Sequence, residues 1–237
     1  FCSLTGLIDD RRGLSPSVKL SAQLTSAIVL VISGVQVQST PWPSVNVAIT
    51  MLWVVGITNA MNLLDNMDGL SAGVAAVSSA FFLLIAALSG QYLVGALAAA
   101  LLGACIGFLV YNSSPASIFM GDAGSLFIGF MLAAVGIKLR FTNNVTFVTW
   151  MVPVLVMGVP IFDTLISPIR RFIRGRDVFQ PDKGHVHHIF LSMGLSPKIV
   201  VQIIYGITLL LCLAAIFLVL YRGKGIGGLI LFLLLIG

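Results

Sequence analysis

The chain has 237 residues, of which 58% are hydrophobic and 9% charged, and its mean hydropathy is +1.08. This composition excludes an ordinary soluble domain and indicates an integral membrane protein. The net charge of +5 suits contact with anionic lipid headgroups and cytosolic phosphates, and no basic stripe with interleaved aromatic residues indicates a nucleic-acid partner. The three cysteines are scattered in apolar segments, which favours buried thiols over a disulfide framework or a thiolate metal site.

Seven apolar runs are long enough to be transmembrane helices, since a hydrocarbon core of roughly 30 Å needs about 20 apolar residues per helix. They lie near residues 20–37, 45–61, 72–88, 92–110, 123–137, 145–165 and 199–220, and the fifth is short unless it starts nearer Ile118. We therefore predict an all-α fold, a polytopic transmembrane helical bundle that forms a single membrane domain over residues 1–237. The chain begins without Met in one apolar stretch and stops inside another, so we expect a fragment with two truncated spans beside the seven complete ones.

The charged residues collect on one side of this bundle. Threading the seven spans alternately through the bilayer places the loops near 9–19, 62–71, 111–122 and 166–198 on the same side, and all eight acidic residues lie there or at the span ends facing it. Most of the cations lie there too, several in the basic, histidine-containing loop 166–198, so the positive-inside bias predicts that this side faces the cytoplasm. A transporter usually places ionisable groups near the membrane midplane. The distribution therefore favours one cytoplasm-facing site.

The first acidic motif is GLIDDRRGL, which contains Asp9 and Asp10. Adjacent residues are about 100° apart on a helix, so the two carboxylates cannot point at one atom without local distortion. Ordinary charge pairing with Arg11 and Arg12 at a membrane exit is the alternative interpretation.

The second motif is NAMNLLDNMDGLSAG, in which four polar residues recur every third position: Asn59, Asn62, Asp65 and Asp68. Three-residue steps drift by about 60° each on an α-helix, so all four can converge only if the helix tightens or breaks near Asn66 and Gly69. A polar helix exit is the alternative, but intramembrane polar groups are costly, which favours a functional site.

The third motif, FMGDAGSLFIG, sets Asp122 between Gly121 and Gly124 at the start of a span. Asp122 could cap that helix. The flanking glycines favour a further role, because they let backbone approach a phosphate or metal closely at a helix N-terminus. A carboxylate there suits Mg²⁺, which keeps oxygen ligands and shares them with substrate phosphates.

The fourth motif, PDKGHVHHIF, contains all three histidines of the chain: His185, His187 and His188. Clustered histidines can bind zinc, but no Cys or Glu is nearby to complete a tetrahedral site. Together with the arginines upstream, including Arg170 and Arg171, the imidazoles are better suited to an anion site. A basic loop that only binds lipid is the remaining alternative. Together the four motifs predict a metal-assisted reaction on a phosphate ester at the membrane surface.

These motifs, with PIFDTLISPIRR between the last two, resemble in order those of the polyprenyl-phosphate N-acetylhexosamine-1-phosphate transferases (MraY/WecA type). The His-x-His-His form is similar to the branch that uses UDP-N-acetylglucosamine for teichoic acid, O-antigen or related polymers. The muramoyl-pentapeptide branch of peptidoglycan synthesis is the alternative, and the departures at Asn66 and Ile189 leave the donor sugar open. A non-catalytic transporter or lipid-binding protein is the competing class.

The resemblance implies a bacterial plasma-membrane enzyme that transfers N-acetylhexosamine-1-phosphate from a UDP-sugar to polyprenyl phosphate and releases UMP. It implies Mg²⁺, with Mn²⁺ as an alternative, held by Asp122 with help from Asn62, and it leaves a homodimer open. Asp9, Asp10, Asp65, Asp68 and Asp122 would be the catalytic residues, with Asp9 and Asp10 beside the acceptor phosphate. Substrate binding would fall to a larger set: Asn59, Asn62, Phe119 (stacking on uracil), Asp163, Arg170, Arg171, His185, His187 and His188.

A phosphate monoester is mostly dianionic at neutral pH, because its second pKa is about 6. It needs little general-base help, so direct attack on the donor is favoured over a covalent phospho-aspartate intermediate. The sequence alone leaves both mechanisms open.

Overall fold

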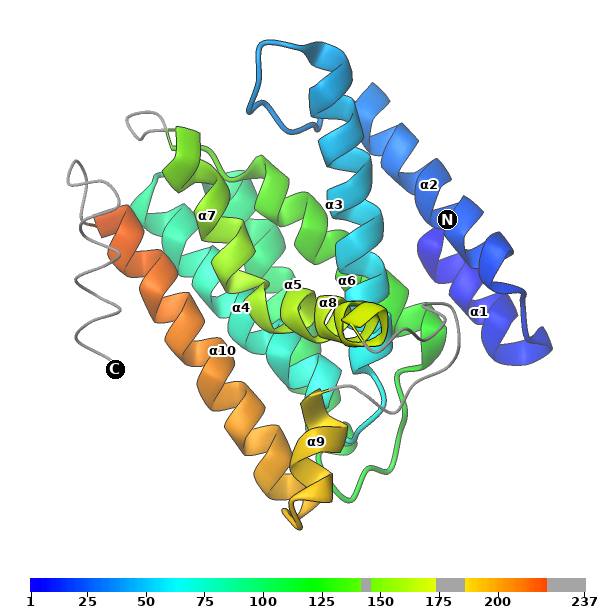
Figure 1. Ribbon diagram of the computed structural model, residues 1–237. Coiled ribbons are helices and arrows are strands. Elements are labelled where there is room, and N and C mark those ends of the chain that lie inside the picture. The colour runs from blue at the N-terminus through cyan, green and yellow to red at the C-terminus, as the bar shows by residue number, and fades with distance from the viewer. Residues whose placement is uncertain (142–145, 174–185, 221–237) are drawn as a thin grey trace.

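The computed structural model describes residues 1–141, 146–173 and 186–220, and every regular element within these ranges is an α-helix. In chain order the helices are α1 (Cys2–Arg12), α2 (Pro16–Ile32), α3 (Pro43–Leu64), α4 (Leu70–Leu88), α5 (Tyr92–Asn112), α6 (Gly121–Lys138), α7 (Thr146–Val156), α8 (Gly158–Ile173), α9 (Val186–Ser192) and α10 (Pro197–Leu220) (Figure 1). Five of them, α3, α4, α5, α6 and α10, are long and apolar enough to cross a membrane, and the bent pair α7 and α8 makes a sixth span if counted as one. The predicted all-α, multi-pass membrane fold is confirmed.

Two of the seven predicted spans look different in the structure. The run at 20–37 forms α2, an apolar helix of 17 residues that ends at Ile32, shortly before Gly34 adopts a left-handed φ of 77°. The run at 145–165 is broken, because α7 and α8 meet at a bend of 72°. Pro153 removes one helix hydrogen bond inside α7. Gly158, the first residue of α8, lies where a Cβ would come within 2.8 Å of Leu211.

The predicted loop 166–198 is partly helical. Its first residues continue α8 as far as Ile173, and α9 covers Val186–Ser192. The side chains of Arg170 and Arg171 and the whole of residues 174–185, which include His185, lie outside what the structure describes.

Helix α4 is at the centre of the bundle. Of its most apolar 18 residues 67% are buried inside the bundle, against 28% of those of α5. Small residues such as Gly73, Ala75 and Ser78 line α4 and let neighbouring helices approach closely. Helix α4 packs mainly on α5 and α10, whereas α3 packs on α6 and α2, and α1 packs on α6. Figure 1 accordingly shows α1 and α2 at one edge of the bundle and α10 at the opposite edge.

Candidate active site

Asp122, the second residue of α6, is held by side chains from two other helices. Lys19 Nζ from α2 donates to Asp122 Oδ2 at 2.7 Å, and Asn62 Nδ2 from α3 donates to Asp122 Oδ1 at 2.9 Å. The same Asn62 amide also donates to Ser125 Oγ, one turn further along α6, at 2.9 Å. The structure thus brings together Asn62 and Asp122, the two predicted metal ligands.

Lys19 bridges two of the predicted catalytic carboxylates. Its ammonium group contacts Asp9 Oδ2 at 2.9 Å as well as Asp122 Oδ2. The other oxygen of Asp9 accepts the backbone N–H of Leu14 at 2.5 Å. The sequence analysis did not single out Lys19, although it is the one cation in the otherwise apolar α2. That isolation was the available signal, because a charge on an apolar helix needs a partner.

Asp10 caps α6 from the end of α1. Its Oδ1 accepts the backbone N–H of Asp122 at 2.8 Å, and its Oδ2 accepts that of Ala123 at 3.1 Å. These are N–H groups of the first turn, which have no partner within the helix. A carboxylate there also interacts favourably with the helix dipole. Asp9 and Asp10 therefore point at different groups, as their angular separation predicts.

Glycines make the contact between α1 and α6 close. A Cβ at Gly6 would overlap the backbone of Asp122 and Ala123, and a Cβ at Gly121, which has a left-handed φ of 64°, would lie 2.7 Å from Asp10 Oδ2. A Cβ at Gly124 would overlap the side chain of Met120. The flanking glycines thus accommodate protein groups at the helix N-terminus, where the sequence analysis expected a phosphate or metal.

The turn between α3 and α4 carries two more of the predicted acidic residues. Helix α3 ends at Leu64, with Asp65 as its C-cap, and Gly69 adopts a left-handed φ of 76° immediately before α4. Asp68 Oδ2 accepts the backbone N–H of Ala116 at 3.0 Å. The predicted break near Asn66 and Gly69 is confirmed.

Asp65, the C-cap of α3, is partly buried near other carboxylates. Burial raises its pKa to about 6, and the negative charges of Asp122 and Asp10 contribute in the same direction. A carboxyl group that is costly to ionise beside other carboxylates marks a place where a cation would be stabilising.

Asn62, Asp65, Asp68 and Asp122 line a cleft of about 280 Å³, whereas Asp9, Asp10 and Lys19 lie behind Asp122 and are not among its lining residues. Phe119 lies at its rim with 77% of its surface exposed, so the ring is accessible for stacking. Asn112, which the sequence analysis missed, also lines the cleft and joins its walls by accepting the N–H of Gly69 and donating to the carbonyl of Ile118. The complete lining is Asn62, Asp65, Asn66, Met67, Asp68, Asn112, Phe119, Met120, Gly121 and Asp122.

The donor atoms of the cleft fit a hard cation. The carboxylates of Asp122 and Asp65 and the side-chain amide of Asn62 offer oxygen atoms, which Mg²⁺ prefers as ligands. Within the described ranges, no group of three or more His, Cys, Asp or Glu side chains is arranged to hold a metal by itself. One or two carboxylates completed by substrate phosphates and water is the usual way in which proteins hold Mg²⁺.

Several predicted substrate-binding residues lie away from this cleft. Asn59 forms a reciprocal amide pair with Gln23 of α2, at 2.6 and 3.2 Å. Asp163 is buried, accepts the backbone N–H of Val186 at 2.6 Å, and lines a separate, largely apolar cavity of about 470 Å³ together with His187. His187 is buried as well, and its ring centroid lies 4.2 Å from that of His188.

Comparison of the sequence with known proteins identifies the family of this chain. The profile of glycosyl transferase family 4 matches residues 1–140, which contain all the cleft residues named above. The chain is 37% identical over 222 residues to the probable undecaprenyl-phosphate N-acetylglucosaminyl 1-phosphate transferase of Bacillus subtilis, covering 90% of this chain and 62% of the relative. It is 37% identical over 229 residues to the decaprenyl-phosphate N-acetylglucosaminephosphotransferase of Mycobacterium tuberculosis, covering 84% and 57% respectively.

A third relative is named for a different sugar. The phospho-N-acetylmuramoyl-pentapeptide-transferase of Halalkalibacterium halodurans is 33% identical over 237 residues, covering 90% of this chain and 70% of the relative. The chain spans about three fifths of the length of the two N-acetylglucosamine-type relatives. The profile match over more than half of the chain and the coverage of the third relative agree with the resemblance seen in the motifs, and the chain belongs to glycosyl transferase family 4.

Proposed function

We propose that the protein transfers N-acetylhexosamine-1-phosphate, with N-acetylglucosamine as the sugar, from a UDP-sugar to polyprenyl phosphate and releases UMP. The acceptor chain stays in the lipid while its phosphate enters the cleft from the membrane surface. The site faces the cytoplasm, where nucleotide sugars are available, in keeping with the excess of cations on that side of the chain.

One observation carries this proposal: Asp122 is fixed between Lys19 and Asn62 in a cleft that also contains Asp65 and Asp68. A cation next to clustered carboxylates and an exposed aromatic ring is a combination suited to a nucleotide diphosphate and its metal. Two of the relatives carry names that specify N-acetylglucosamine phosphate transfer to a polyprenyl phosphate, which supports this donor.

The proposed reaction is a direct displacement at phosphorus. An oxygen of the acceptor phosphate attacks the sugar-bearing phosphorus of the donor, a new P–O bond forms, and the bond to UMP breaks. Both oxygens of Asp9 and of Asp10 already accept hydrogen bonds. This supports positioning roles for the two residues over nucleophilic attack by either one. Exchange of labelled UMP into the donor without lipid acceptor would instead indicate a covalent intermediate.

Asp122, with Asn62, would hold Mg²⁺, and Mn²⁺ is the alternative metal. When bound, the ion supplies charge neutralisation on the donor diphosphate and on the departing UMP. Lys19 and Asn62 orient the Asp122 carboxylate through their hydrogen bonds, and Asp65 and Asp68 form the wall against which the nucleotide would lie.

The direct test is incubation of the protein in its full natural length with UDP-N-acetylglucosamine, undecaprenyl phosphate and Mg²⁺, with release of UMP as the readout. We expect UMP only when both substrates and the metal are present. Asp122→Asn keeps the shape but loses the charge, so it should lower turnover at least about 100-fold while the melting temperature shows a folded protein. UMP release that needs no divalent ion would refute the role of the metal.

The second candidate donor is the UDP-linked muramoyl pentapeptide, favoured by the Halalkalibacterium relative of which this chain covers 70%. Replacing the donor in the same assay separates the two, because the muramoyl sugar carries a peptide-bearing lactyl group that N-acetylglucosamine lacks. Absence of UMP release with either donor would favour a non-catalytic membrane protein.

A further inference from the structure

The turn between α3 and α4 is held in place by groups from elsewhere in the chain. Gly69, at the end of this turn, donates its N–H to Asn112 Oδ1 from α5 at 3.0 Å. Asp68, the residue before it, accepts the N–H of Ala116. These two bonds fix one peptide and one side chain of a segment that forms a wall of the catalytic cleft.

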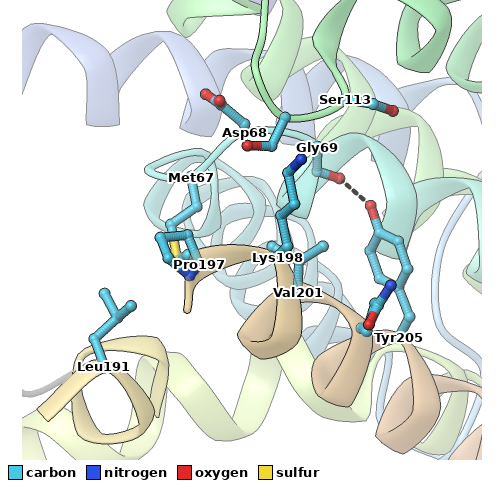
Figure 2. Close-up of a pocket in the computed structure, with 11 residues that line it drawn as sticks. Met67, Asp68, Gly69, Ser113, Leu191, Pro197, Lys198, Val201 and Tyr205 are labelled. Atoms are coloured by element: carbon cyan, nitrogen blue, oxygen red, sulfur yellow. Dashed lines mark hydrogen bonds between the residues drawn. The ribbon is translucent and has the colours of Figure 1, made fainter. Parts of the chain in front are cut away.

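A third group comes from the last described helix. The Tyr205 hydroxyl of α10 donates to the carbonyl of Gly69, across 136 positions of sequence (Figure 2). Its ring lies directly against Gly73, one turn into α4, where a Cβ would overlap the phenol. Packing on Gly73 therefore fixes the ring of Tyr205, and the hydrogen bond to Gly69 fixes its hydroxyl.

Tyr205 lies on the far side of the turn from the cleft. It lines a second cavity of about 480 Å³, which shares only Met67 and Asp68 with the cleft. Figure 2 shows Asp68 and Gly69 between α10 and the loop that carries Ser113. A bond on this outer side of the turn can affect substrate only through the turn itself.

We propose that Tyr205 is a positioning residue for donor binding. Its hydrogen bond holds the carbonyl of Gly69, which also accepts the N–H of Gly73 at 2.8 Å. By holding Gly69, it limits the directions in which the adjacent Asp68 can face the nucleotide side of the cleft. The inference rests on the proposed function, since the donor is the ligand whose binding it affects. Asp9, Asp10 and Lys19 make none of the hydrogen bonds that hold this turn, so the acceptor end of the reaction should be insensitive to Tyr205.

The test is Tyr205→Phe in the full-length protein, which keeps the ring on Gly73 and removes only the hydroxyl. The net value of one hydrogen bond corresponds to a factor of about 2 to 12. We expect KM for UDP-N-acetylglucosamine to rise about fivefold, with kcat and KM for polyprenyl phosphate changed less than twofold. Tyr92→Phe is the matched control, because Tyr92 is 90% exposed, and it should leave all three constants unchanged.

Two results would overturn the proposal. Unchanged KM for the donor would show that the hydrogen bond does not reach the site. Equal losses in donor and acceptor constants together with a lower melting temperature would show a purely structural role. A wild-type protein that turns over neither candidate donor would instead refute the proposed function itself.

Discussion

Removal of the Lys19 ammonium tests the electrostatic centre of the site. In Lys19→Met the two contacts to Asp9 and Asp122, at 2.9 and 2.7 Å, are lost, and both carboxylates remain without this cation, Asp122 within the electrostatic reach of Asp65. A hydrogen bond to a charged group contributes about 1.5–3 kcal/mol when well shielded. The Lys19, Asp9 and Asp122 side chains are 26%, 12% and 23% exposed, so solvent screening reduces this value. We expect a loss of about 2 kcal/mol in the free energy of unfolding for the pair of contacts.

The assay is unfolding in mixed micelles for Lys19→Met, Asp122→Asn and the double variant, with UMP release measured on the same samples. The double-mutant cycle formed by these variants should give a coupling free energy of about 1 kcal/mol between Lys19 and Asp122. Turnover of Lys19→Met should fall at least about tenfold. Arg12→Met, which removes an exposed cation of α1, is the control. Additive effects of the two substitutions, or a Lys19→Met protein as stable and active as the control, would refute the reasoning.

Three further outcomes follow from other parts of the structure. Gly6→Ala should lower the melting temperature and activity, because its Cβ would overlap the α6 backbone, at a cost of about 1–3 kcal/mol; Gly56→Ala, which has open space, should be close to neutral. Without divalent ions, the pKa of Asp65 is raised to about 6 in the folded protein, which therefore binds the carboxyl proton more tightly than the unfolded chain does. The stability that this proton contributes is lost as pH rises from about 4 through 6. Asp65→Asn should therefore gain more in melting temperature over wild type at pH 7.5 than at pH 5, and an equal gain at both would contradict this. A cysteine at Ser192 should react with an impermeant maleimide from the cytoplasm and one at Tyr92 from outside, and the reverse pattern would place the cleft on the other face.

Hydropathy predicted most of the spans because a membrane helix must present apolar side chains over its whole length. The runs at 45–61 and 92–110 lie within α3 and α5. Hydropathy did not predict the bend between α7 and α8, because both helices are apolar and a hydropathy profile contains no information on the direction of a helix axis. Pro153 was the available warning, but a proline alone does not say whether a membrane helix kinks slightly or turns by 72°.

Local spacing also predicted one part of the site. The four residues spaced by three, from Asn59 to Asp68, can converge only if the helix tightens or breaks near Asn66 and Gly69, and the structure ends α3 at Leu64. The pairing of Lys19 with Asp122 spans 103 residues, and no local pattern contains it. Asn59 shows that local spacing can also predict too much, because this residue shares the spacing of the site residues but pairs with Gln23. Periodicity identifies a face of a helix, and only tertiary packing decides which part of that face meets substrate.

The cap on α6 restricts where a phosphate group could bind in the proposed reaction. A free helix N-terminus attracts phosphate through its unpaired N–H groups and its dipole. Here the Asp10 carboxylate already accepts the N–H groups of Asp122 and Ala123. A second anion at the same place would meet that negative charge, so α6 cannot serve as the phosphate cradle that its glycines suggested. In the proposed reaction the donor diphosphate would instead be neutralised from the side, by a divalent ion held on Asp122, while Lys19 stays paired with Asp9 and Asp122 and balances part of the charge of the carboxylate cluster.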